Sequence, residues 1–286
     1  MTPFELLEPR SLRKAAALLA SDGGVVRPMG GGTALMLMMK MGVLRPTRLV
    51  SLRGIEKRYS RISAVKEGGL RIGALATLSE IERAPAVRRE APVIAQTLRT
   101  LANVRVRNVA TLGGHLAHAD PHLDLPPVLI ALGASVEISG ANGVRTVPLE
   151  QLYSGYLETT LAPGELIAEV RIPRQRPRYA AYLKCTTRSA DDWPALGVAV
   201  LVDREVDRVR DARMVVSAAT DTPTRLKETE KALCGTDVSP DALRRLGDIA
   251  ASEVTLMADA HGSAPYKKEL LRVYVARAIR SALEQR

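Results

Sequence analysis

The chain has 286 residues, 46% of them hydrophobic, and a formal net charge of +10 at pH 7. That length is enough for two domains with separate cores. Its two cysteines exclude a four-thiolate iron–sulfur cluster, and no run approaches the ~18 apolar residues of a membrane span. The basic residues are scattered rather than clustered with aromatics, which argues against a nucleic-acid partner. Without a signal-peptide pattern, the chain is predicted to be cytoplasmic.

The first predicted elements place a glycine loop between a strand and a helix. A helix over Leu12–Leu19, ended by Asp22-Gly23-Gly24, precedes a strand over Val25–Met29, the loop Gly30-Gly31-Gly32-Thr33 and a helix over Ala34–Lys40. Strand, glycine loop and helix in this order point backbone N–H groups and a helix dipole at an anion. The spacing is neither that of a P-loop nor that of a dinucleotide-binding fingerprint, so an ordinary tight turn before a core helix stays open.

Strands and helices then alternate along the rest of the chain. The predicted elements are a strand over Arg48–Leu52, a hairpin over Tyr59–Val65 and Leu70–Gly73, a helix opened by the capping box Thr77–Glu80, helices over Pro92–Ala102 and Leu125–Leu132, a hairpin over Ser135–Ser139 and Val144–Val147, and a strand over Glu165–Ile172. Beyond these come strands over Ala180–Thr186, Leu196–Asp203 and Val209–Ala218, and helices over Thr224–Leu233, Pro240–Val254 and Pro265–Leu283. The proline-bracketed segment Pro173–Pro177 predicts a boundary between domains over 1–173 and 178–286.

The stretch from Asn108 to Asp124 carries the densest set of ligand-binding side chains. Its glycine pair, Gly113-Gly114, is expected to form a turn and to let a ligand approach backbone N–H groups. Thr111 offers a hydroxyl, while Asp120 and Asp124 accept hydrogen bonds from hydroxylated ligands. The segment is therefore expected to hold a phosphate at one end and a sugar or ribityl hydroxyl at the other. The alternative is a plain turn before a helix capped by Asp124.

Three histidines in this stretch, His115, His118 and His122, raise the question of a metal site. Pro121 and the glycine pair argue against a regular helix that would align them, so we expect polar loop histidines and no metal. No nucleophile elbow is present, and no catalytic side chain is predicted.

The polar loop from Lys184 to Pro194 holds the only tryptophan of the chain, Trp193. One interpretation is an aromatic wall over a planar ligand, because polar loops that carry a large ring often contact ligands. The other is a strand end at the surface, or an anchoring ring buried under the C-terminal sheet.

Taken together, these stretches resemble the FAD-binding medium subunit of molybdenum hydroxylases. That family includes the flavoprotein subunits of carbon monoxide dehydrogenase and 4-hydroxybenzoyl-CoA reductase and the flavin domain of xanthine dehydrogenase. The resemblance rests on Gly30-Gly31-Gly32-Thr33-Ala34-Leu35, on Asn108 to Gly114 followed by Asp120-Pro121 and Asp124, and on Pro163-Gly164-Glu165-Leu166-Ile167. It covers nearly the whole chain.

The resemblance implies an α+β fold in which two α/β subdomains, about 1–55 and 56–173, clamp FAD in the vanillyl-alcohol-oxidase (PCMH) manner. A C-terminal domain of three antiparallel strands and a helical bundle follows. The implied cofactor-binding residues are Pro28, Met29, Gly30, Gly31, Gly32, Thr33 and Ala34 around the diphosphate; Ala110, Thr111, Gly113, Gly114, His115, Asp120 and Asp124 along the rest of the cofactor, lined by Leu101 and Ala102; and Ile167, Lys184 and Trp193 near the flavin ring. His115 and Asp120 stand where relatives often have Asn and Ser. No cysteine-rich insertion for an extra cluster is present.

The resemblance also implies a role and partners. This subunit would carry FAD beside a large molybdopterin-binding subunit and a small subunit with two 2Fe–2S clusters, in a dimer of heterotrimers. Electrons would pass from a cluster through FAD to an external acceptor, and the redox chemistry would belong to the cofactor. Two alternatives remain: a flavoenzyme that works alone, and a basic binding module without catalysis. The oxidised substrate is not readable from this chain.

Overall fold

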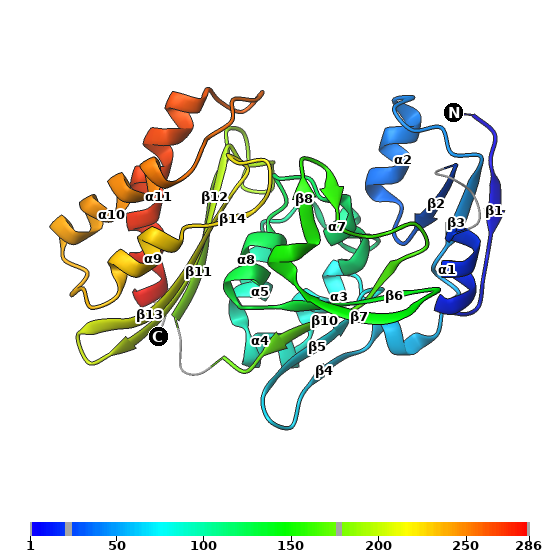
Figure 1. Ribbon diagram of the computed structural model, residues 1–286, viewed down its shortest axis with the longest axis horizontal. Coiled ribbons are helices and arrows are strands. Elements are labelled where there is room, and N and C mark those ends of the chain that lie inside the picture. Colours follow the sequence, from blue (N-terminus) through cyan, green and yellow to red (C-terminus); the bar gives the residue numbers. More distant parts are fainter. Residues whose placement is uncertain (1, 21–24, 176–178, 285–286) are drawn as a thin grey trace.

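The computed structural model describes residues 2–20, 25–175 and 179–284. The predicted helix end at Asp22-Gly23-Gly24 and part of the predicted linker therefore lie outside the described residues. The N-terminal subdomain, at the right of Figure 1, is a small parallel sheet of order β1-β3-β2 with two helices. Its elements are β1 (Glu5–Leu7), α1 (Leu12–Ala20), β2 (Val26–Met29), α2 (Thr33–Lys40) and β3 (Arg48–Ser51). Strand β1 was not predicted, because three residues with two exposed show no periodicity.

The central subdomain contains an antiparallel sheet of order β4-β5-β10-β6-β7. Its strands are β4 (Ile62–Ala64), β5 (Gly69–Gly73), β6 (Ser135–Gly140), β7 (Gly143–Pro148) and β10 (Leu166–Pro173), with a separate pair, β8 (Tyr153–Gly155) and β9 (Glu158–Thr159). Its helices are α3 (Leu78–Arg83), α4 (Pro85–Glu90), α5 (Pro92–Leu98), α6 (Val104–Arg107), α7 (Leu112–His118) and α8 (Leu125–Ala131), with 3-10 turns η1 (Lys57–Ser60) and η2 (Leu149–Leu152).

Two local predictions in this subdomain are confirmed in detail. The Thr77 hydroxyl accepts a hydrogen bond from the Glu80 backbone N–H, and the Glu80 carboxylate accepts one from the Thr77 N–H at 2.7 Å, which is a complete capping box. The hairpin of β6 and β7 closes at Gly143, whose φ of 115° lies in the region that favours glycine.

The C-terminal domain, at the left of Figure 1, is an antiparallel sheet of order β11-β12-β13-β14 followed by three helices. The elements are β11 (Tyr179–Cys185), β12 (Leu196–Glu205), β13 (Arg208–Ser217), β14 (Thr224–Arg225), α9 (Lys227–Leu233), α10 (Pro240–Glu253) and α11 (Ala264–Glu284). The three long strands and the three helices are as predicted. Residues Thr224 and Arg225 leave the predicted helix because they pair with β13 as a short edge strand.

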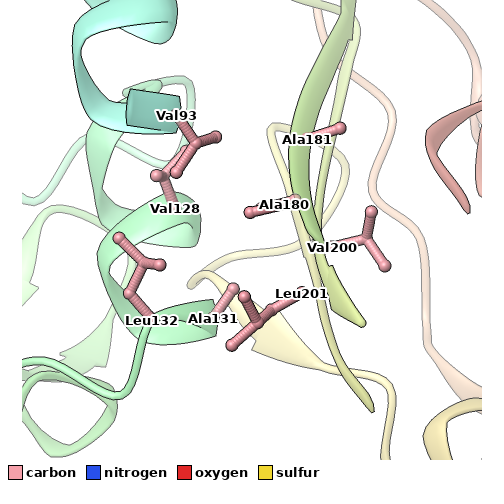
Figure 2. A pocket seen from close by; sticks show the side chains of 9 residues that line it. Val93, Val128, Ala131, Leu132, Ala180, Ala181, Val200 and Leu201 are labelled. Atoms are coloured by element: carbon pink, nitrogen blue, oxygen red, sulfur yellow. The ribbon is translucent and has the colours of Figure 1, made fainter. Parts of the chain in front are cut away.

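Both faces of this sheet are buried, one of them against the central subdomain. The sheet therefore joins the C-terminal domain to the central subdomain. Figure 2 shows Ala180 and Leu201 pointing toward helices α5 and α8, whereas Ala181 and Val200 point the other way. Leu201 belongs to the same buried cluster as Leu98 of α5, while Val200 shares a cluster with Leu271 of α11. Among residues 2–20, 25–175 and 179–284, no helix has both the length and the hydropathy needed to cross a membrane.

Candidate cofactor-binding site

The two glycine motifs, far apart in sequence, lie against each other. A Cβ atom on Gly30 would sit 2.6 Å from the Thr111 hydroxyl oxygen, and one on Gly31 would sit 2.1 Å from the Val109 carbonyl oxygen. Nonbonded carbon and oxygen atoms clash sterically at these distances, so both positions need glycine. Gly31 has the stricter requirement, since the atom it would strike belongs to the backbone. The loop before α2 is thus pressed onto the segment that leads into α7.

The expected turn at Gly113-Gly114 is not present, because both residues lie in the first turn of α7. Thr111 caps this helix, and its hydroxyl accepts a hydrogen bond from the Gly114 N–H at 3.3 Å. Helix α7 ends at His118 and is followed by Ala119, whose φ is 55°. Pro121 lies beyond the end of α7, so His115 and His118 are on the helix whereas His122 is not. The prediction that no regular helix aligns the three histidines is confirmed, although the glycine pair itself is helical.

The two glycines of α7 have different surroundings. A Cβ on Gly113 would come within 2.7 Å of the Ala74 Cβ, so this residue packs against the segment that follows β5. Gly114 is exposed, and a Cβ there would meet only its own capping hydroxyl, at 3.0 Å. Gly113 therefore serves packing within the chain, whereas Gly114 leaves its side of the helix bare.

Backbone hydrogen bonds connect this motif to the central sheet. Leu112 donates to the Ala76 carbonyl at 3.0 Å, and Leu78 donates to the Ala110 carbonyl at 3.0 Å. Ala74 donates to the Ala168 carbonyl on β10, beside Ile167, at 3.0 Å. The start of α7 is thus fixed relative to the strand that carries Ile167.

His115 carries an unsatisfied polar atom. Its Nε2 is buried and has no hydrogen-bond partner among the residues that the structure describes. Burial, helped by the charge of nearby His118, lowers the pKa of His115 to about 3. The imidazole is therefore neutral at physiological pH. Because buried polar atoms in folded proteins are nearly always paired, this nitrogen fits a site completed by a ligand.

Asp124 stands directly before α8 but does not cap it. Its carboxylate accepts hydrogen bonds from the Tyr182 hydroxyl at 2.7 Å and from the Lys184 Nζ at 2.9 Å. The capping alternative is wrong for a simple reason: Pro126 and Pro127, the second and third residues of the helix, have no N–H to donate. Burial outweighs the attraction of Lys184 and raises the pKa of Asp124 above its usual value.

Lys184 gathers three segments around its ammonium group. Besides Asp124 it donates to the Thr100 carbonyl at 2.8 Å and to the Asp192 carbonyl at 3.1 Å. A cavity of about 390 Å³ opens here, and its lining includes Thr97, Thr100, Tyr182 and Lys184. The neighbouring carbonyls of Leu101 and Ala102 are both held by the guanidinium of Arg107, at 3.1 and 2.6 Å.

Trp193 is 47% exposed, so the alternative of a ring buried under the sheet is wrong. Its indole stacks on the imidazole of His122, with ring centroids 5.5 Å apart and an angle of 8° between the planes. His122 in turn bonds through Nδ1 to Asp120 Oδ1 at 2.8 Å. Sequence reasoning considered His122 only as a metal ligand and missed its contact with Asp259, because that partner is 137 positions away.

The sequence-predicted residues thus fall into two groups joined by α7. One group is the glycine loop from Pro28 to Ala34 with Ala110, Thr111, Gly113, Gly114 and His115. The other is formed by Leu101, Ala102, Asp120, Asp124, Lys184 and Trp193 at the contact with the C-terminal domain, and Ile167 lies on β10 beside α7. Closely packed glycine motifs at one end and hydrogen-bonding side chains at the other are typical of proteins that bind an extended, phosphate-bearing cofactor.

Comparison with known proteins identifies the family. The family described as "FAD binding domain in molybdopterin dehydrogenase" matches residues 2–175, and "CO dehydrogenase flavoprotein C-terminal domain" matches residues 181–282. The nicotine 6-hydroxylase medium subunit of Paenarthrobacter nicotinovorans is 32% identical over 271 residues, 95% of this chain and 94% of that protein.

Solved structures agree with this match. Carbon monoxide dehydrogenase from Hydrogenophaga pseudoflava superposes with a TM-score of 0.94 at 30% identity, over 99% of this chain and 98% of that one. Quinoline 2-oxidoreductase from Pseudomonas putida 86 gives 0.92 at 26%, over 98% and 97%. The chain belongs to the FAD-binding medium subunits of molybdenum hydroxylases, the carbon monoxide dehydrogenase and xanthine dehydrogenase family. It is a flavoprotein subunit of an oxidoreductase complex, and FAD is its cofactor.

Proposed function

We propose that this chain takes electrons from a 2Fe–2S cluster of a partner subunit and passes them through FAD to an external acceptor. The observation that carries the proposal is the contact between the two glycine motifs, continued along α7 to Asp124 and Lys184. Relatives bear names such as "medium chain" and "medium subunit", which imply partner chains. We propose a large molybdopterin-binding subunit and a small iron–sulfur subunit as partners, in a dimer of heterotrimers. The cytoplasmic location stays a prediction of the sequence.

The residues present fit FAD at both ends. Backbone N–H groups of the loop from Gly30 to Thr33 and the bare side of α7 at Gly114 would face the diphosphate, where glycine permits close approach. The unpaired Nε2 of His115 would complete its hydrogen bonding with the cofactor. Bound FAD supplies the electron-transfer chemistry of the subunit, and the protein positions and tunes it.

At the ring end, we propose that Asp120 and Asp124 use their remaining lone pairs for cofactor hydroxyls or ring nitrogens. An ionised carboxylate has about four acceptor sites. Asp124 shows two bonds, from Tyr182 and Lys184, so it keeps capacity for a ligand. Ile167, Lys184 and Trp193 would lie near the isoalloxazine, with Leu101 and Ala102 along the cofactor. The buried Asp124–Lys184 pair would hold this end rigid when the cofactor binds.

The proposal is tested on the native complex. Affinity purification of the tagged chain from its own cells should recover two further polypeptides, with molybdenum and iron in fixed ratio to flavin. Adding the substrate that the complex oxidises should bleach the flavin absorbance near 450 nm only when both partners are present. A chain that purifies alone, and whose flavin is reduced directly by a substrate, would establish the stand-alone flavoenzyme instead. A chain that never carries flavin would leave only a basic binding module.

A further inference from the structure

His122 is a buried residue at the junction between the cofactor segment, defined here as residues 119–124, and the C-terminal domain. Its Nδ1 lies 2.8 Å from Asp120 Oδ1, and its Nε2 lies 2.9 Å from Asp259 Oδ2 in the loop before α11. The side chain is only 8% exposed. The ring therefore bridges two carboxylates that come from opposite sides of the junction.

The bridge continues into the C-terminal domain. Asp259 Oδ2 also pairs with the ammonium of Lys267 at 2.5 Å, and Lys267 is wholly buried. That ammonium donates to the Ala218 carbonyl at 2.8 Å, and the Ala218 N–H donates to the Pro121 carbonyl at 2.8 Å. This chain of hydrogen bonds runs from His122 of the cofactor segment through the C-terminal domain to Pro121 of the same segment. The segment is therefore held at two neighbouring residues.

The geometry specifies the charge on His122. A neutral imidazole has one N–H and one acceptor nitrogen, whereas an imidazolium donates from both. Because both ring nitrogens face carboxylate oxygens, only the imidazolium donates to two ionised carboxylates at once. Burial alone would lower the pKa of His122, but the hydrogen bonds with Asp120 and then Asp259 outweigh it and raise this pKa above its usual value. The other titratable groups around it are His118 on α7, His261 at 5.2 Å, and Lys267.

One face of the imidazolium is covered by Trp193. An aromatic ring stacked on a cation gains an electrostatic attraction in addition to the effect of burial. Here the planes of the indole and the imidazole are 8° apart. The backbone next to Trp193 is held in place, because the Asp192 carbonyl accepts a hydrogen bond from Lys184 Nζ. The indole thus rests on the cofactor segment while remaining 47% exposed on its other side.

We infer that His122 is a positioning residue: bonded to Asp120 and Asp259, its imidazolium fixes the place of the Trp193 indole and the orientation of the Asp120 carboxylate. The inference rests on the proposed function, in which Trp193 and Asp120 face the cofactor. It adds that a single histidine aligns both of these contacts and links them to the C-terminal domain. Losing the proton removes one of the two bonds and the cation beneath the indole, so the indole is released.

Trp193 is the only tryptophan, so its emission reports its own surroundings. A contacting imidazolium quenches indole fluorescence, whereas a neutral imidazole quenches it far less. In the purified full-length chain without FAD, we expect emission to rise in one step as pH passes above the ordinary histidine value of about 6.5. His122→Gln should abolish the step. The matched controls His118→Asn and His261→Asn should keep it.

A second variant separates positioning from simple packing. Asp120→Asn keeps an acceptor but removes one negative charge, so the midpoint of the step should move to lower pH while the step itself persists. A step that survives in His122→Gln, disappears in His261→Asn, or keeps its midpoint in Asp120→Asn overturns the inference. If circular dichroism shows that His122→Gln does not fold, the midpoint measured in Asp120→Asn still tests the inference.

FAD binding is scored separately, by absorbance after gel filtration. A normal fluorescence step in a chain that never binds FAD contradicts the proposed function and leaves the role of His122 in fixing the indole intact. If the wild-type chain binds FAD but shows no fluorescence step, the role of His122 is contradicted and the proposed function is left intact.

Discussion

The two ends of the proposed cofactor site are built by different means. The glycine end uses backbone packing: the loop at Gly30 and Gly31 touches Thr111 and Val109 with no room for a side chain. The junction end uses buried charge: Asp124 with Lys184, and Asp120, His122, Asp259 and Lys267 in a row. At Gly30 and Gly31 an added atom is costly, whereas at the junction end a lost partner is costly.

The largest effect is expected where one partner of the best-buried charge pair is removed. Lys184 and Asp124 side chains are 7% and 6% exposed, so Lys184→Ala leaves a carboxylate buried without a cation. Such a loss typically costs about 3–5 kcal/mol. Urea unfolding of the FAD-free chain should show it. Lys227→Ala, at a pair whose lysine is 68% exposed, should leave the midpoint unchanged. Equal effects for the two variants would contradict the description of the junction.

A smaller loss is expected at the glycine end. Gly31→Ala places a methyl group 2.1 Å from the Val109 oxygen, so the loop or the start of α7 must move. Overpacking of this kind costs about 1–3 kcal/mol. Gly155→Ala serves as a control, because its Cβ would meet only a Glu158 carboxylate oxygen at 3.4 Å and its φ, like that of Gly31, is not in the left-handed region. The difference in unfolding free energy between the two variants isolates the contact from the backbone preference.

The two ends should also respond to pH in opposite directions. His115 has its pKa lowered to about 3 in the folded chain, so the unfolded chain takes up a proton that the folded one refuses. Its contribution to stability is present above the ordinary histidine pKa of about 6.5 and falls by at most ~1.4 kcal/mol per pH unit below it. His115→Asn should flatten the stability profile between those two pKa values. An unchanged acid slope in that variant would mean that His115 is not the buried neutral residue described here.

His122 should act on the alkaline side, with a smaller effect. Its folded-state pKa is raised, so its contribution is fully present below the ordinary pKa and is lost as pH rises through the raised value. His122→Gln should therefore lose less stability than the wild-type chain between neutral and mildly alkaline pH. Thermal melts across that range measure it, and a variant profile parallel to the wild-type profile would contradict the account.

The same contrast explains what the sequence could predict. Local signals were sufficient for the capping box at Thr77, the hairpin turn at Gly143 and the glycine loop after β2, because a few adjacent residues determine each. Helix α7 was missed because two glycines lower helix propensity, while the Thr111 cap and contacts with Ala74 and Ala76 override it. The prolines after Leu125 are visible in the sequence, and their missing N–H groups could have excluded the Asp124 cap that was left open as an alternative.

The junction end could not be derived in this way. Its pairs join residues separated by 60 positions for Lys184 and Asp124 and by 137 for His122 and Asp259. No periodicity or spacing marks such a pair. The position of Lys184 was identified through family resemblance, whereas nothing in the sequence pointed to the pairing of His122 with Asp259.

The central claim, that the bare side of α7 faces FAD, is tested most directly at Gly114. Its Cβ would meet only the Thr111 hydroxyl within the chain, so Gly114→Val should fold with a melting temperature of the FAD-free form close to wild type. In the proposed complex the same side chain would occupy the approach to the cofactor. Gly114→Val is expected to purify folded and colourless and to show no FAD binding by calorimetry. A folded Gly114→Val that retains one FAD per chain would contradict it.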